Sequence, residues 1–195
     1  MILWLALILI AVAFRVSTPD LGGLSNIAPL MAISFCAAIY LPRKWAFIIP
    51  FAALLVSDLI LNSYYNTPLF QSFMLATYTC YFLAALLGLW IARHKNIKTL
   101  LGGCVASTLL FFVVTNTLAW MTDPVYAKSL GGWFQALTVG DLIHQPATWV
   151  FLRNSLTSDI VFTALFAGCM EWSAAKHGLP SLLPAFEPSK ANSGA

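Results

Sequence analysis

Charged side chains are scarce in this sequence. Lys, Arg, Asp and Glu make up only 9% of its 195 residues, whereas 60% of them are hydrophobic. A soluble domain carries roughly 25% charged residues. The composition therefore excludes an ordinary soluble enzyme and predicts an all-α integral membrane protein whose main surroundings are a lipid bilayer. No basic face is left outside the membrane loops, so nucleic-acid binding has no support.

The motifs of several large enzyme and nucleotide-binding classes are also missing. The sequence has no Walker A loop, no Rossmann glycine pattern, no G-x-S-x-G and no H-E-x-x-H. Its four cysteines lie singly in apolar runs, without C-x-x-C spacing, so no disulfide framework is predicted. No internal repeat is evident, which argues against an inverted-repeat transporter.

Long apolar runs predict six membrane-spanning helices, because a spanning helix needs about 20 mostly apolar residues. Most tryptophans fall near the ends of these runs, where indole favours the membrane interface. We expect one transmembrane domain over residues 1–175 and a disordered cytoplasmic tail over 176–195. The predicted helices cover residues 1–16, 27–41, 45–63, 69–92, 99–121 and 149–172.

The positions of Lys and Arg predict the orientation, since cytoplasmic loops carry the excess of positive charge. With the N-terminus inside, seven of these residues fall on the cytoplasmic side and three, Arg15, Lys128 and Arg153, on the outer side. Both termini are therefore expected in the cytoplasm. Arg15 follows the first apolar run instead of preceding it, which favours a retained helix over a signal peptide.

Polar residues gather in the outer halves of the predicted helices, beneath two long outer loops over 17–26 and 122–148. Intramembrane polar groups usually face the interior of a bundle, and long loops often cover binding sites. Together they predict a pocket open to the outside. The residues concerned are Asp58, Asn62, Thr77, Cys80, Thr115, Asn116, Thr117, Arg153, Asn154, Ser155, Ser158 and Asp159.

Two structural interpretations of this cluster remain open. Asp58, Asn116, Arg153 and Asp159 would satisfy one another and tie the helices together, or Asp58 would act as a helix cap and pair with Arg153. His144, in the second outer loop, would either contact a ligand or stay solvated.

Cys80 falls near the middle of the fourth predicted helix, on a ridge of small side chains that includes Thr77, Ala84 and Gly88. Helical periodicity favours close helix packing as the reason for this ridge. The alternative is room for a flat, bulky ligand against the thiol. A lone cysteine cannot build a zinc or iron–sulfur site. If Cys80 binds a metal, the other ligands must arrive with it, as in a corrinoid or haem.

Four segments carry a family resemblance that extends over about residues 1–175. They are NIAPLMAISFCAAIYLPRKWAFIIPFAALLVSDLILN (26–62), TYTCYF (77–82), TNTLAW (115–120) and FLRNSLTSDIVFTALF (151–166). In their order and spacing the chain resembles the BtuM family, cobalamin-specific proteins of Gram-negative bacteria. This family is similar to the substrate-binding S-components of energy-coupling-factor (ECF) vitamin transporters.

The resemblance implies a six-helix S-component-like bundle that takes up cobalamin (vitamin B12) across the bacterial inner membrane. It implies that Cys80 is the axial cobalt ligand of cobalamin held base-off, so that the cobalt arrives with the vitamin and no free metal ion is expected. Slow decyanation of cyanocobalamin by Cys80 would follow as a side activity. An ECF energising module would be the partner, or none. The candidate cobalamin contacts are Cys80, Arg153, Asn26, Asn116, Thr77 and Asp58.

Three other functions stay open. The chain could carry another vitamin or a metal, with Cys80 serving only for packing. It could be a membrane enzyme, although its best acid–base pair, Asp58 with His144, is weak. It could also be a structural or assembly protein of the membrane, against which the one-sided polar cluster argues.

Overall fold

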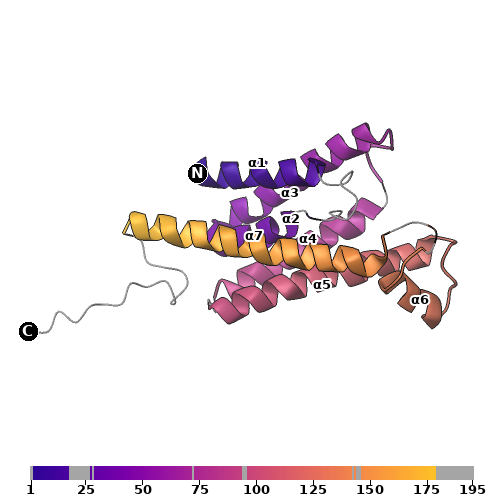
Figure 1. The fold of residues 1–195 in the computed structure, drawn as a ribbon. Coiled ribbons are helices and arrows are strands. Elements are labelled where there is room, and N and C mark those ends of the chain that lie inside the picture. Colours follow the sequence, from indigo (N-terminus) through magenta and orange to yellow (C-terminus); the bar gives the residue numbers. More distant parts are fainter. Residues whose placement is uncertain are drawn as a thin grey trace, which may run out of the picture.

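The computed structural model describes residues 2–17, 27, 29–71, 73–93, 96–141, 143 and 146–178, and all regular secondary structure in these ranges is α-helical (Figure 1). Asn26, His144, most of the first outer loop and residues 179–195 lie outside them. The helices are α1 (Ile2–Ser17), α2 (Leu30–Tyr40), α3 (Arg43–Tyr64), α4 (Phe73–Ile91), α5 (Ile97–Thr122), α6 (Leu130–Leu137) and α7 (Thr148–Lys176).

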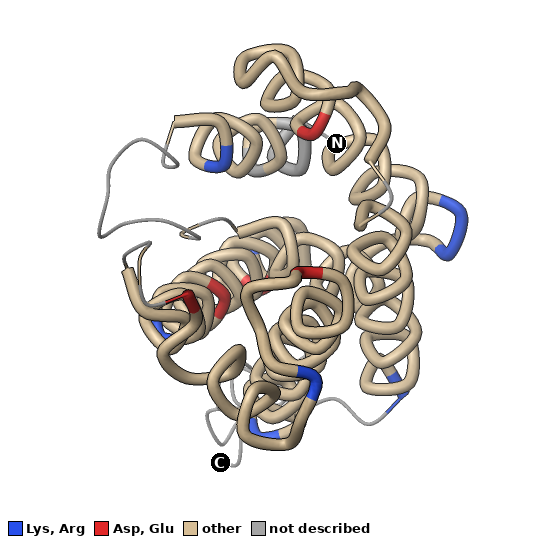
Figure 2. The backbone as a smooth tube through the Cα atoms, turned by 90° about the vertical axis from the view of Figure 1, so that its right-hand side faces the viewer, with Lys and Arg blue, Asp and Glu red and all other residues tan. Residues whose placement is uncertain are grey.

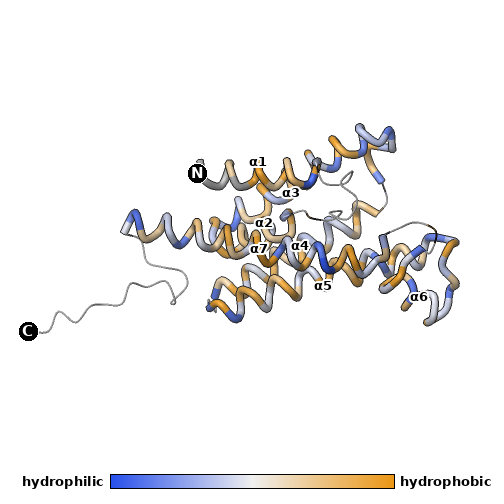
Figure 3. Tube along the Cα trace, viewed as in Figure 1, coloured by the Kyte–Doolittle hydropathy of each residue, from blue (hydrophilic) through white to orange (hydrophobic). Residues whose placement is uncertain are grey.

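Four of these helices, α3, α4, α5 and α7, are long and apolar enough to cross a membrane. Many of their large apolar side chains point away from the protein interior. Leu75 is 77% exposed, for example, although it belongs to a strongly apolar helix. Figure 3 colours the backbone by residue hydropathy and shows apolar residues along much of the length of these helices. An apolar exterior of this kind suits a lipid environment, so the four long helices support the predicted membrane character.

α2 is the centre of the bundle. It has only 11 residues, and every one from Leu30 to Ile39 is buried. It packs most extensively against α3, α4 and α7. An element that is apolar on all sides must be enclosed by others, and the uniformly apolar sequence of α2 explains its position.

Close packing of α4 on α2 depends on Gly88. A Cβ atom added there would lie 2.7 Å from the carbonyl oxygen of Phe35 and 2.8 Å from Cβ of Ala38. Cys80 and Ala84, on the same ridge of α4, are each 1% exposed. The packing interpretation of this small-residue ridge is therefore confirmed for its inner half, at Ala84 and Gly88.

The two ends of the bundle differ. α1 begins and α7 ends at the same end, whereas the start of α7 and the whole of α6 lie at the other (Figure 1). Figure 2 looks at the bundle from the α6 end and shows the few charged positions spread over its helices. We refer to this end as the α6 end.

α6 was not among the six predicted helices. Its first turn is capped by Ser129, whose hydroxyl oxygen accepts a hydrogen bond from the amide of Gly132. A side chain at Gly132 would collide with the carbonyl of Ala127, so this glycine permits the tight turn before the helix. The indole N–H of Trp133 donates to Thr117 Oγ1 at 2.9 Å and attaches α6 to the end of α5.

Candidate functional site

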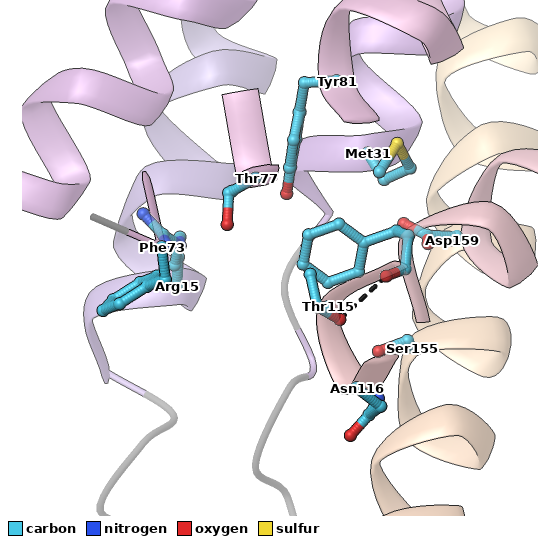
Figure 4. Close-up of a pocket in the computed structure, with 10 residues that line it drawn as sticks. Arg15, Met31, Phe73, Thr77, Tyr81, Thr115, Asn116, Ser155 and Asp159 are labelled. Carbon is cyan, nitrogen blue, oxygen red and sulfur yellow. Dashed lines mark hydrogen bonds between the residues drawn. The ribbon is translucent and has the colours of Figure 1, made fainter. Parts of the chain in front are cut away.

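A cavity of about 320 Å³ opens among five helices near the α6 end (Figure 4). A second cavity of about 510 Å³ adjoins it and shares Phe73, Thr77 and Thr115 with it. The first is the more polar, and its lining includes two charged side chains, Arg15 and Asp159, whereas Asp123 is the one charged residue that lines the second. Its lining residues are Arg15 of α1, Met31 of α2, Phe73, Thr77 and Tyr81 of α4, Phe111, Thr115 and Asn116 of α5, and Ser155 and Asp159 of α7.

One wall carries an ion pair between α1 and α3. Nη1 of Arg15 lies 2.6 Å from Asp58 Oδ1 and donates to Ser57 Oγ at 2.5 Å. Ser57 is fully buried and Asp58 is 7% exposed, so the pair lies inside the bundle. Oδ2 of Asp58 has no hydrogen-bond partner among the described residues. Charges in lipid are costly unless paired, which explains why the last turn of α1 and the second half of α3 meet here.

The opposite wall carries Asp159, which is 3% exposed. Its Oδ2 accepts a 2.7 Å hydrogen bond from the Thr108 hydroxyl, and its Oδ1 accepts one of 3.3 Å from the amide of Ala32. Ala32 lies in the first turn of α2, where backbone amides have no partner within the helix. Pro29, the N-cap of α2, makes no side-chain cap. Asp159 therefore supplies the cap from α7, and the positive end of the helix dipole favours its charge.

The remaining lining is a mixture of aromatic rings and short polar groups. The rings of Tyr81 and Phe111 pack edge to face with centroids 5.8 Å apart. The Thr115 hydroxyl and the Asn116 amide nitrogen each donate to a carbonyl of their own helix at 2.8 Å. The carboxamide oxygen of Asn116 accepts no hydrogen bond from any described residue, so it is available as an acceptor for a ligand. Such a surface suits a ligand with apolar faces and a few polar substituents.

The family model that matches residues 1–182 is described as DUF6580, a family of unknown function. The chain belongs to the DUF6580 family. No curated protein and no solved structure matches it. The site is therefore interpreted from its own geometry.

Two of the six predicted cobalamin contacts, Thr77 and Asn116, line the cavity. Asp58 lies behind the wall and reaches the cavity only through Arg15. Cys80 is 1% exposed and is not part of the lining, although Thr77 and Tyr81, which precede and follow it on α4, both are. Asn26 falls outside the described residues.

Arg153 is exposed and does not line the cavity. Its guanidinium contacts the Asn154 carboxamide oxygen at 3.1 Å and stacks 5.4 Å from the centroid of the Trp149 ring. The predicted pairing of Arg153 with Asp58 is therefore wrong, because Asp58 is taken by Arg15.

The interpretation that Asp58, Asn116, Arg153 and Asp159 satisfy one another is also wrong. Each has a different partner: a cation on α1, a carbonyl of its own helix, a neighbour on α7 and a helix N-terminus, respectively. Two of these four, Asn116 and Asp159, face the cavity.

Arg15 is the residue that sequence reasoning missed. A single charge at the end of an apolar run is typical of a residue that reaches the membrane surface. The sequence did contain a signal for this pair, because the first predicted helix has one cation and the third has one carboxylate. Only the packing of α1 on α3 brings the two together. Phe73, Tyr81 and Phe111 were also missed, because the sequence of a membrane helix does not distinguish an aromatic residue that faces lipid from one that lines a cavity.

Proposed function

We propose that this protein is a membrane carrier that binds a small molecule in the cavity at the α6 end and takes it up across the bacterial inner membrane. The observation that carries the proposal is the gathering of polar side chains from α1, α4, α5 and α7 around one cavity, in a chain with few charges. Polar groups are expensive in lipid and mark substrate pathways.

In this proposal α1 and α2 also cross the bilayer, giving six crossings and cytoplasmic termini. The α6 end then faces outward. The bundle works as an S-component-like carrier, either docked on an ECF energising module or alone. Its small size and few charges suit a protein that reorients in the bilayer.

Cobalamin is the first ligand to test, because the sequence resemblance points to it. In the bound state Cys80 would ligate cobalt, while Thr77 and Asn116 would contact amide groups on the corrin ring. The thiol is one residue from Tyr81 on α4 but is enclosed in the resting structure. Ligation therefore requires the ring of Tyr81 or the helix itself to shift. If only a fraction of the molecules is open at any time, the apparent affinity for cobalamin is the intrinsic affinity multiplied by that fraction.

A smaller solute is the second candidate, favoured by the enclosure of Cys80. The two cavities, about 320 and 510 Å³, fall in the range of about 300–1,000 Å³ that holds drug-sized ligands. Cobalamin, with its corrin ring and nucleotide arm, is larger than such ligands. In this case Cys80 extends the packing ridge of Ala84 and Gly88, and the solute contacts only the cavity lining.

The visible spectrum of added cobalamin decides between the two. Purified protein is mixed with aquocobalamin and cyanocobalamin and freed of unbound vitamin, and its spectrum is compared with that of the Cys80→Ala variant. Cys169→Ala is the matched control, because Cys169 lies on α7, outside the cavity lining. Thiolate ligation predicts a shifted spectrum in the wild type and the control but not in Cys80→Ala, together with slow loss of cyanide.

If Cys80→Ala binds cobalamin with an unchanged spectrum, Cys80 is not the cobalt ligand. If the wild type retains no vitamin, cobalamin is the wrong ligand, and a growth-based uptake screen over smaller vitamins tests the second candidate.

A further inference from the structure

Arg15 lines the cavity with hydrogen-bond donors that have no acceptor among the described residues. Both of its polar contacts, to Ser57 and Asp58, are made by Nη1. Neither Nε nor Nη2 forms a hydrogen bond with any described residue. A guanidinium carries five N–H donors in a fixed planar arrangement. At least the three on Nε and Nη2 are therefore available.

The free donors of Arg15 matter because the side chain is largely buried at the cavity wall. The Arg15 side chain is only 21% exposed and belongs to the cavity lining. Buried donors without a partner are costly, and the guanidinium is better matched than any other side chain to two oxygens of one carboxylate or phosphate. The ion pair with Asp58 joins one nitrogen, Nη1, to one carboxylate oxygen. The donors on Nε and Nη2 therefore remain able to bind two oxygens of another group.

We propose that Arg15 binds an oxyanion, a phosphate or carboxylate group, of the molecule that occupies the cavity. This inference rests on the proposed function only in assuming that the cavity holds a solute, whichever solute it is. Asp58 and Ser57 fix the guanidinium on α1, and Nε and Nη2 donate to the two oxygens.

The two walls of the cavity then differ in charge, so a bound solute has one preferred orientation. Arg15 lies on one side of it with Phe73 and Thr77, and Asp159 and Ser155 lie on the other (Figure 4). The solute places its oxyanion toward α1 and a hydrogen-bond donor toward α7. The aromatic rings between the two walls contact its apolar middle part.

Asp58 moderates this site. Its carboxylate neutralises Arg15 in the empty protein and keeps the cation from being an isolated charge in the membrane. It also competes with an incoming anion for the same guanidinium. Removing the charge of Asp58 should therefore strengthen oxyanion binding, whereas removing the charge of Arg15 should abolish it.

The test uses inorganic phosphate as the probe, which requires no knowledge of the natural solute. The full chain is purified in a maltoside detergent, whose head group is uncharged. Its thermal unfolding midpoint is measured with potassium phosphate and with potassium chloride at equal ionic strength and pH. A bound anion stabilises the folded state by mass action, so the wild type should unfold at a higher temperature in phosphate.

Four variants complete the test. Arg15→Gln should lose the phosphate-dependent shift, because losing hydrogen bonds to a charged group weakens binding roughly ten- to hundredfold. Arg15→Lys should keep part of it, since lysine offers charge without the planar donor pair. Asp58→Asn should enlarge it. Lys176→Gln, which removes one positive charge from the last turn of α7, should leave it unchanged.

A wild-type protein with no phosphate-dependent shift, or a shift equally large in Arg15→Gln, overturns the proposal. Comparing each variant with itself in the two salts keeps the outcome independent of how much the substitution lowers stability. If Arg15→Gln fails to fold, the wild type and Asp58→Asn still decide, because an unchanged or smaller shift in Asp58→Asn overturns the proposal.

Two further arms identify where the oxyanion comes from. Cobalamin carries a phosphodiester and cobinamide lacks it, so wild-type protein that holds this group at Arg15 prefers cobalamin, and Arg15→Gln does not. Short-chain phosphatidylglycerol tests a lipid head group in the same way. A phosphate shift without cobalamin binding supports the oxyanion site while rejecting cobalamin as the solute.

Discussion

Gly88 sets how closely α4 can approach α2. The backbone of α2 passes so near that a Cβ atom added to Gly88 would lie only 2.7 Å from the carbonyl oxygen of Phe35. Gly102 on α5, by contrast, has no neighbouring atom within 4 Å of an added Cβ. The two glycines are therefore a matched pair in which only one is needed for packing.

Gly88→Ala should lower the free energy of unfolding by about 1–3 kcal/mol, the usual effect of forcing an extra carbon into a packed interior. Gly102→Ala should be neutral or stabilising by up to about 1 kcal/mol, because alanine favours the helix. Thermal unfolding of both variants in detergent measures the difference. Equal midpoints would show that α4 can move away from α2 without cost.

At the residue scale the sequence predicted which polar side chains lie at one end of the bundle, but not their partners. Depth along a helix follows from counting residues, and this placed Thr77, Asn116 and Asp159 correctly near the cavity. Partners depend on how helices pack, which one sequence does not contain. Pairing of Arg153 with Asp58 was one open interpretation, yet Arg15 is the cation that α1 brings to Asp58.

At the scale of elements, α6 differs from the rest. It has eight residues, and two of its apolar side chains, Leu130 and Phe134, are exposed. The hydrogen bond from Trp133 to Thr117 attaches it to α5 near the cavity. A short, partly exposed element at the end of the bundle should open locally at a low cost in free energy.

Trp133→Phe keeps the ring and removes this hydrogen bond. We expect faster proteolysis within residues 123–147 and little change in the global unfolding midpoint. Trp172→Phe, at the exposed far end of α7, is the control and should not change the cleavage rate. Thr117→Val should reproduce the effect of Trp133→Phe, and the double variant should add nothing further, because both remove the same bond. Additive effects would mean that the bond does not hold α6.

Helices within long apolar runs were predictable, including the short α2, whereas α6 was not. The expected ranges for α3, α4, α5 and α7 differ from the observed bounds by at most four residues at either end, because apolar runs of this length have few alternatives to a helix. α6 was absent from the prediction because two adjacent glycines, Gly131 and Gly132, are typical of a loop. Ser129, the N-cap of α6 in the structure, is a sequence signal that could have marked its start.

At the scale of the whole molecule, the number of membrane crossings is the main open prediction. The four long helices alone would put residues 67 and 95 on opposite sides, and so would six crossings. The two arrangements differ at residues 18–26, which are outside if α1 and α2 cross and inside if they do not.

A single cysteine at residue 22, Gly22→Cys, tests this in a variant whose four native cysteines are replaced by alanine. We expect a membrane-impermeant maleimide to label it in intact cells. Thr67→Cys is the outer control and Lys95→Cys the inner one, which should react only after permeabilisation. Protection of the residue 22 cysteine until permeabilisation would limit the chain to four crossings.

The shortness of α2 has an electrical consequence. Eleven residues span about 16 Å, whereas the hydrocarbon core of a bilayer is about 30 Å thick. The cavity begins at the first turn of α2, where Met31 lines it. If α2 crosses the bilayer as proposed, its short length leaves only a thin insulating layer between the cavity and the opposite side of the membrane. The transmembrane voltage, worth about 2.3 kcal/mol per charge per 100 mV, would then fall over roughly half the usual distance, so a charged solute at the cavity floor would experience a steeper field than it would in lipid.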